Sequence, residues 1–308
     1  MSKVLTIYIL LIPLVLTSVS SHLSTVSAAC KADKDSIELP FDPANNLIVI
    51  PVTLNGKGPF HFLVDTGASH HVVKPELAQS LGLKVLGEGG IDAGGWKTVS
   101  AGLVEVMELR ISNFTLEKQR LFVTPFPSSY PFEGFIGAEL FKQFVVSVDF
   151  RQSLITLTRP NTFRYRGSGV ILPLKFHEGL IPQVKAKVGD NVGWFKLDTG
   201  YNGSLVLFGD FIERHNLLVK YAPQKSSPGG QTLTGEVGDA PLAQIHKFKL
   251  GDVVLDNVDT SFFLEKGGYN SAFSGAIGTA LLNRFNVIID YKGRRMILER
   301  REQSSVGL

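Results

Sequence analysis

One short pattern occurs twice in the chain: an apolar run that ends in Asp-Thr-Gly. The first copy is Phe62-Leu-Val-Asp65-Thr66-Gly67 and the second is Phe195-Lys-Leu-Asp198-Thr199-Gly200. The apolar residues predict buried strands, and a lone carboxylate at the end of a core strand is unfavourable by several kcal/mol when nothing compensates it. We therefore expect Asp65 and Asp198 to meet and to share that cost.

The segments that follow the two motifs also correspond. A second motif, two apolar residues followed by glycine, occurs later in each half. It ends at Gly137, 72 residues after the first aspartate, and at Gly278, 80 residues after the second. An aspartate before an aromatic residue then follows each glycine by 12 residues, at Asp149 and Asp290. These matching intervals indicate two copies of one unit, with a boundary within residues 159–169.

Each unit is predicted to be built of strands. Residues 47–54 read as a buried strand that stops at Asn55-Gly56, a strong hairpin signal. Helical stretches such as 75–81 are too few and too short for alternating strands and helices. We predict an all-β protein of two closed lobes, 30–165 and 166–308, related by an approximate two-fold axis.

A two-fold arrangement would present the two Asp-Thr-Gly loops face to face. Thr66 and Thr199 can then exchange hydrogen bonds across the junction, while Gly67 and Gly200 allow the backbones to approach closely. Two neighbouring carboxylates do not both ionise easily, so one pKa is raised and the pair shares a proton. Such a dyad can hold a water, with one member accepting its proton and the other donating to a carbonyl.

With these motifs the chain resembles the pepsin/retropepsin clan of aspartic proteases, and more closely the exported proteins that carry two retropepsin-like lobes on one chain. The resemblance covers residues 45–300. The resemblance implies an endopeptidase that acts on peptides or proteins without a cofactor or metal, with Asp65 and Asp198 as catalytic residues. The alternative is a weak or inactive peptide-binding protein that keeps the groove between the lobes.

The residue after each Asp-Thr-Gly departs from the pepsin-like branch, which has a hydroxyl residue there. Here these positions are Ala68, as in the retropepsin branch, and Tyr201, followed by Asn202-Gly203. Because losing a hydrogen bond to the charged form raises the pKa of a carboxylate, we expect an activity optimum near about pH 4–6. Tyr201 and Asn202 also keep the inactive alternative open.

Residues 87–95 are rich in glycine and are predicted to form a mobile hairpin or loop that does not pack. The segment follows the first motif closely enough to fold over a cleft. Two interpretations of Trp96 stand side by side: a substrate contact at the tip of this loop, or an anchor between the loop and the core.

Other chemistries find less support. His70 and His71 are adjacent, so on a strand they point to opposite faces, and no companion ligand has zinc spacing. The Gly-x-Ser-x-Gly motif of serine hydrolases is not present in the sequence. A glycosidase also uses two acids, but it does not require them to lie in repeated sequences, as a symmetric dyad does. A net charge of +3 without a basic tract does not favour nucleic acid. Asp149 and Asp290 are interpreted as acids that stabilise turns and take no part in catalysis. The protein is expected to be a monomer.

The N-terminus predicts export. Lys3, the apolar run 4–16 and Ser27-Ala28-Ala29 form the three parts of a signal peptide over residues 1–29. We expect a secreted or periplasmic protein, with lipid anchoring through Cys30 as the less favoured alternative. No later segment has the ~20 apolar residues of a bilayer span, so no stable membrane span is expected.

Overall fold

The computed structural model describes residues 35–301, apart from 44–45, 94–96, 129, 228–230, 233–234 and 237–239. The predicted signal segment, Cys30 and Trp96 lie outside the described residues, so what was inferred for them stays a prediction. Within the described ranges, no helix is long and apolar enough to cross a membrane.

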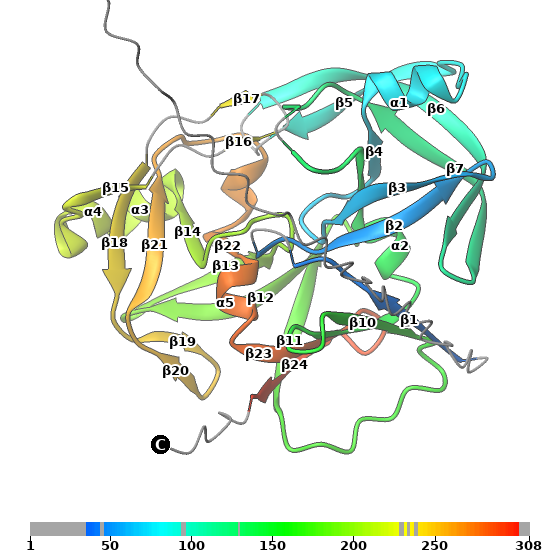
Figure 1. The fold of residues 1–308 in the computed structure, drawn as a ribbon. Coiled ribbons are helices and arrows are strands. Elements are labelled where there is room, and N and C mark those ends of the chain that lie inside the picture. Colours follow the sequence, from blue (N-terminus) through cyan, green and yellow to red (C-terminus); the bar gives the residue numbers. More distant parts are fainter. Residues whose placement is uncertain are drawn as a thin grey trace, which may run out of the picture. The chain divides into compact units, whose positions relative to one another are not determined.

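The first lobe is a closed barrel of six strands. The strands are β2 (Val49–Leu54), β3 (Lys57–Val64), β4 (His71–Val73), β6 (Lys97–Ile111), β7 (Phe114–Val123) and β8 (Gly134–Ile136). Their hydrogen-bonded order is β2–β3–β8–β4–β7–β6, and β6 pairs back onto β2 through Thr53 and Arg110 (Figure 1). Asn55 and Gly56 turn the chain between β2 and β3 with φ angles of 49° and 75°, as the Asn-Gly pair predicts.

The second lobe repeats this order. Its strands are β12 (Ile181–Val188), β13 (Asn191–Leu197), β14 (Leu205–Phe208), β18 (Ala240–Ile245), β19 (Phe248–Leu250), β20 (Val253–Leu255), β21 (Val258–Phe263) and β22 (Gly275–Ile277). The order β12–β13–β22–β14–β21–β18 matches the first lobe, and β19 pairs with β12 as β6 pairs with β2. Lys247, with φ of 61°, lies in the break between β18 and β19. The repeat inferred from the motifs is thus a repeat of strand topology.

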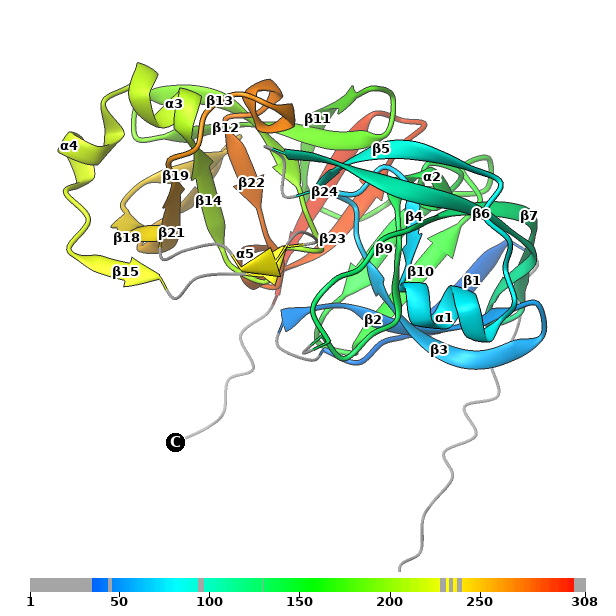
Figure 2. The same ribbon diagram turned by 90° about the horizontal axis from the view of Figure 1, so that it is seen from above.

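A six-stranded antiparallel sheet joins the lobes. It consists of β1 (Ser36–Pro40), β9 (Val145–Asp149), β10 (Leu154–Thr158), β11 (Val170–His177), β23 (Phe285–Asp290) and β24 (Arg295–Arg300), in the order β1–β10–β9–β23–β24–β11 (Figure 2). At its centre Ser147 lies opposite Ile288. These two residues each precede the matched aspartates Asp149 and Asp290 by two positions, so the pseudo-two-fold axis passes between them.

The short helices also follow the repeat. Helix α1 (Pro75–Ser80) corresponds to α3 (Gly209–Arg214), and α2 (Ala138–Phe141) corresponds to α5 (Thr279–Leu282). Helix α3 does not continue into the next helix, because Asn216 adopts a left-handed conformation with φ of 52°, and α4 (Leu217–Tyr221) follows. A 3-10 helix, Tyr269–Ala272, precedes β22.

Of the hairpin or loop expected for residues 87–95, the hairpin is present over the described residues 87–93. Residues Gly87–Ala93 form β5, which pairs along β6. Two of its glycines have close neighbours: a Cβ on Gly89 would lie 2.9 Å from the Phe122 ring, and one on Gly90 would lie 2.9 Å from Thr98 Cγ2. Backbone pairing needs no side chain, so a glycine-rich strand forms where the adjacent surface leaves no room for one. In the second lobe β15 (Lys225–Ser227) pairs with β18, and β16 (Gln231–Thr232) with β17 (Gly235–Glu236).

Candidate active site

The two aspartates stand at equivalent places, each directly after a strand that runs parallel to an apolar-apolar-Gly strand. The Asp65 N–H donates to Ile136 O at 3.0 Å, and the Asp198 N–H donates to Ile277 O at 3.0 Å. In each lobe the strand before Asp-Thr-Gly therefore pairs with the strand of the apolar-apolar-Gly motif: β3 lies beside β8, and β13 lies beside β22. This pairing fixes the backbone of both Asp-Thr-Gly loops.

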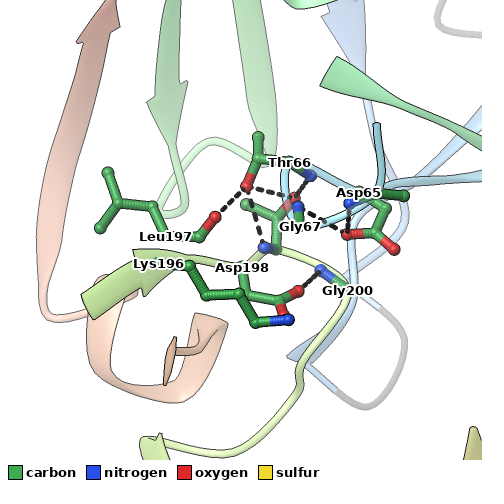
Figure 3. A network of polar contacts seen from close by, with 9 residues as sticks. Asp65, Thr66, Gly67, Lys196, Leu197, Asp198 and Gly200 are labelled. Atoms are coloured by element: carbon green, nitrogen blue, oxygen red, sulfur yellow. Dashed lines mark hydrogen bonds and ion pairs between the residues drawn. The ribbon is translucent and has the colours of Figure 1, made fainter. Parts of the chain in front are cut away.

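Thr66 and Thr199 link the loops across the lobe junction by reciprocal hydrogen bonds. The Thr66 N–H donates to Thr199 Oγ1 at 3.0 Å, and the Thr199 N–H donates to Thr66 Oγ1 at 3.2 Å (Figure 3). Each hydroxyl in turn donates to a carbonyl of the opposite lobe, Thr66 to Leu197 O at 2.8 Å and Thr199 to Val64 O at 2.6 Å. The exchange expected from the sequence is present, and both side chains are buried.

Thr66→Val is expected to lower the free energy of unfolding by roughly 2–4 kcal/mol, because it leaves the Thr199 N–H and the Leu197 carbonyl buried without partners. Urea unfolding measures the change. Thr66→Ser, which keeps the hydroxyl, serves as the control and should lose much less. Equal losses in the Val and Ser variants would contradict the assigned hydrogen bonds.

The glycines of the two motifs bring each carboxylate against the opposite loop. A Cβ built on Gly67 would lie 2.5 Å from Asp198 Cγ, and one on Gly200 would lie 2.5 Å from Asp65 Cγ. Both positions need glycine for space. The structure thus brings together all six predicted residues of the two motifs, with Asp65 and Asp198 facing each other across the junction.

The two carboxylates have different hydrogen-bond partners. Asp65 Oδ1 accepts the N–H groups of Gly67 at 2.8 Å and Ala68 at 3.1 Å. Asp198 Oδ1 accepts the Gly200 N–H at 3.1 Å, while its Oδ2 forms an ion pair with Lys196 Nζ at 2.9 Å (Figure 3). The dyad is therefore asymmetric although the fold around it is nearly symmetric.

Asp65 favours its protonated form. Burial, together with the negative charge of Asp198, raises the pKa of Asp65 to about 7, against the lowering effect of Lys196 and of two backbone N–H groups. A carboxyl that keeps its proton up to about neutral pH can act as a hydrogen-bond donor and general acid.

Lys196 is a functional candidate that the sequence reasoning missed. It is two positions before Asp198, where the first lobe has the buried Leu63. Its side chain is only 13% exposed, and Nζ lies 5.8 Å from the Phe208 ring centroid and 6.0 Å from that of Phe273. The available signal was a lysine inside an otherwise apolar strand, because a buried lysine requires a partner.

Tyr201 does not take the place of the hydroxyl residue found in the pepsin-like branch. Its OH donates to Leu205 O at 3.4 Å, within the second lobe. Burial raises the pKa of Tyr201, so the phenol stays neutral over the pH range in which carboxylates titrate.

His70 and His71 connect the segment after the first motif to Gly137 and Glu139. The buried His71 accepts the Gly137 N–H on Nδ1 at 3.1 Å, and burial lowers its pKa, which favours the neutral ring. The exposed His70 lies with Nδ1 3.0 Å from a Glu139 carboxylate oxygen. In the described part of the chain, no three His, Cys, Asp or Glu residues are arranged to hold a metal ion.

Asp149 and Asp290 cap turns, as expected. Asp149 Oδ1 accepts the N–H groups of Arg151 and Gln152, and Asp290 accepts the Gly293 N–H and pairs with Arg295 at 2.9 Å.

Two lobes of one topology, joined by a six-stranded sheet and meeting at paired Asp-Thr-Gly loops, define the fold class of the aspartic proteases. Comparison with known proteins agrees: residues 50–140 match the family model described as aspartyl protease. No curated protein matches the chain. The resemblance to the pepsin/retropepsin clan inferred from the motifs is confirmed, and it supports an aspartic-protease-like function.

One solved structure shares this two-lobed fold. An aspartic proteinase from Irpex lacteus superposes with a TM-score of 0.57 at 12% identity, covering 88% of this chain and 99% of that one. A retropepsin-like aspartic protease from Rickettsia conorii matches 40% of this chain and 90% of its own, with a TM-score of 0.30 and 19% identity.

Proposed function

We propose that this protein is an aspartic endopeptidase, hydrolysing peptide bonds with a water held between Asp65 and Asp198. The observation that carries the proposal is the pair itself: two carboxylates, one from each lobe, each pressed against the opposite glycine, with the pKa of Asp65 raised to about 7. At mildly acidic pH this pair holds one proton and one negative charge, the state that acid–base catalysis by a dyad requires.

The proton movements balance over one turnover. The ionised carboxylate takes a proton from water as the water oxygen bonds to the peptide carbonyl carbon, and the protonated carboxyl donates to the carbonyl oxygen. The resulting diol collapses when the first proton passes to the amide nitrogen and the C–N bond breaks. A diol hydroxyl returns its proton to the second carboxylate, which restores the dyad. Each acid–base step contributes about 10²–10⁴-fold.

A peptide-binding protein without hydrolytic activity is the second candidate, because Tyr201 and Asn202 depart from the family pattern. The hydrogen bonds of the second loop argue for the enzyme. The second loop makes the same hydrogen bonds as the first at three equivalent places. These are the N–H groups of Asp198, Thr199 and Gly200, which correspond to those of Asp65, Thr66 and Gly67.

A statine-containing peptide separates the candidates, because its tetrahedral carbon bears a hydroxyl that imitates the diol. At 100 times its dissociation constant it should stabilise the protein by about 2.7 kcal/mol, or roughly 5–10 °C in Tm. The measurement is thermal unfolding at pH 5 with this peptide and with its deoxy analogue as control. Alongside it, a pool of fluorescence-quenched peptides reports hydrolysis.

Stabilisation together with hydrolysis that the statine peptide inhibits would support the endopeptidase. Stabilisation by both peptides without hydrolysis would favour the binding protein. Absence of both effects would overturn the proposal.

A further inference from the structure

We propose that Lys196 is a positioning residue that assigns the two aspartates their roles, keeping Asp198 ionised as the base and leaving the proton of the dyad on Asp65 as the acid. The inference rests on the proposed function of the same site. It adds to that function a residue outside the Asp-Thr-Gly motifs and a fixed direction of proton transfer.

The contact geometry carries the first step. Lys196 Nζ lies 2.9 Å from Asp198 Oδ2, while Oδ1 of the same carboxylate accepts the Gly200 N–H. Both oxygens of Asp198 thus have a donor, one of them cationic. The paired side chains are 13% and 12% exposed, and the rings of Phe208 and Phe273 lie near the ammonium group. Solvent therefore screens this interaction less than it would a surface pair.

The second step is the break in symmetry. The position equivalent to Lys196 in the first lobe is Leu63, which is 2% exposed and apolar. Among the residues that the structure describes, Asp65 receives two backbone N–H groups but no ion pair. A cation at one side of a nearly symmetric dyad favours charge on the nearer carboxylate, because the attraction falls with distance. The proton then resides on Asp65.

The other titratable groups that face the dyad leave this bias unopposed. Tyr130 and Tyr291 lie near Asp65, and Tyr201 lies near Asp198. Burial raises the pKa of all three phenols, that of Tyr130 to about 12, so they carry no charge in the working range. Lys196 is the cation that acts on Asp65 among the described residues.

This arrangement also accounts for the departure at Tyr201. A hydroxyl after the second motif would stabilise the charged carboxylate by a hydrogen bond. Here the Tyr201 hydroxyl bonds elsewhere in the lobe, and the Lys196 ammonium occupies Oδ2 of Asp198 instead. The charge of Asp198 is thus stabilised by Lys196, which precedes the second motif, in place of a hydroxyl residue that follows it.

The first test reads the protonation state and does not need activity. In the purified protein labelled with ¹³C at aspartate side-chain carboxyls, Asp65→Asn and Asp198→Asn assign the two signals. At pH 5 we expect the Asp198 signal of a carboxylate and the Asp65 signal of a carboxylic acid. In Lys196→Leu, which copies Leu63, the two signals should move towards each other as the proton becomes shared.

Lys196→Arg keeps the charge and should restore the wild-type signals. Lys187→Leu removes an exposed lysine from the neighbouring strand β12 and is the matched control, with no change expected. If Lys196→Leu does not fold, Lys196→Gln removes the charge while keeping a donor, and the same comparison applies. A protonated Asp198 at pH 5 in the wild type, or equal signals in wild type and Lys196→Leu, would overturn the inference.

The second test is the pH profile of kcat/KM on the peptide of the quenched pool that is cleaved fastest. Lys196 favours ionised carboxylates, so its removal should move the acidic limb up by about 1–3 pH units and the alkaline limb in the same direction. Lys196→Arg should return both limbs. If the carboxyl signals are as expected but no peptide is hydrolysed, only the proposed function is refuted. If peptides are hydrolysed but the pH profile of Lys196→Leu equals that of the wild type, only the role of Lys196 is refuted.

Discussion

Asp65→Asn and Asp198→Asn are each expected to lower kcat/KM by at least about 10³-fold, and to change stability in opposite directions. Asparagine keeps the shape of aspartate but neither accepts nor releases a proton at these pH values. Each variant therefore removes one half of the dyad, and peptide hydrolysis that survived both would contradict the mechanism.

Asp65→Asn should stabilise the protein at alkaline pH. The pKa of Asp65 is about 7 in the folded protein against an ordinary value of 3.8. Between those values the folded state holds a proton that the unfolded state has released, so the free energy of unfolding falls as pH rises through this window. Asparagine removes that loss, and we expect a gain of about 1–2 kcal/mol at pH 8 that disappears at pH 3.

Asp198→Asn should destabilise the protein at the same pH. The substitution leaves the Lys196 ammonium, 13% exposed, without its carboxylate partner. Removing one member of a buried ion pair is unfavourable by about 3 kcal/mol. Urea unfolding of both variants and the wild type at pH 8 and pH 3 measures the two effects. Changes of the same sign at pH 8 would contradict the asymmetric dyad.

The lobes and the meeting of the two aspartates could be predicted because their signals are local and repeated. An apolar run before Asp-Thr-Gly specifies a strand that ends at an acid, and equal 12-residue intervals mark the second copy. Hydrogen-bond exchange between Thr66 and Thr199 follows once the copies face each other. Each of these inferences needs only residue type, spacing and symmetry.

The environment of Lys196 could not be predicted in this way. The phenylalanine rings near its ammonium come from Phe208, at the end of β14, and Phe273, beside the 3-10 helix, two segments far apart in the chain. The central sheet presents the same difficulty. Residues 145–149 and 285–290 each read as half of a local hairpin, and nothing in either segment indicates that β9 and β23 pair with each other.

Gly67→Ala and Gly200→Ala are expected to lower kcat/KM by about 10²-fold or more and to destabilise the fold by about 1–3 kcal/mol. Neither glycine has an unusual φ angle, so the effect is purely one of space. The added methyl group would lie 2.5 Å from the Cγ atom of the opposite aspartate. The threonine hydrogen bonds hold both loops in place, so the carboxylate has to move out of the dyad geometry.

Gly87→Ala is the matched control, because a Cβ at Gly87 meets nothing within 4 Å and its φ is not positive. Its activity and its urea midpoint should equal those of the wild type. The measurements are kcat/KM on the fastest peptide and urea unfolding at pH 5. Gly67→Ala and Gly200→Ala should each displace the carboxylate of the other lobe, so in ¹³C-labelled protein the first perturbs the Asp198 signal and the second the Asp65 signal. Perturbation confined to the aspartate of the same motif would show that the two loops are not in contact.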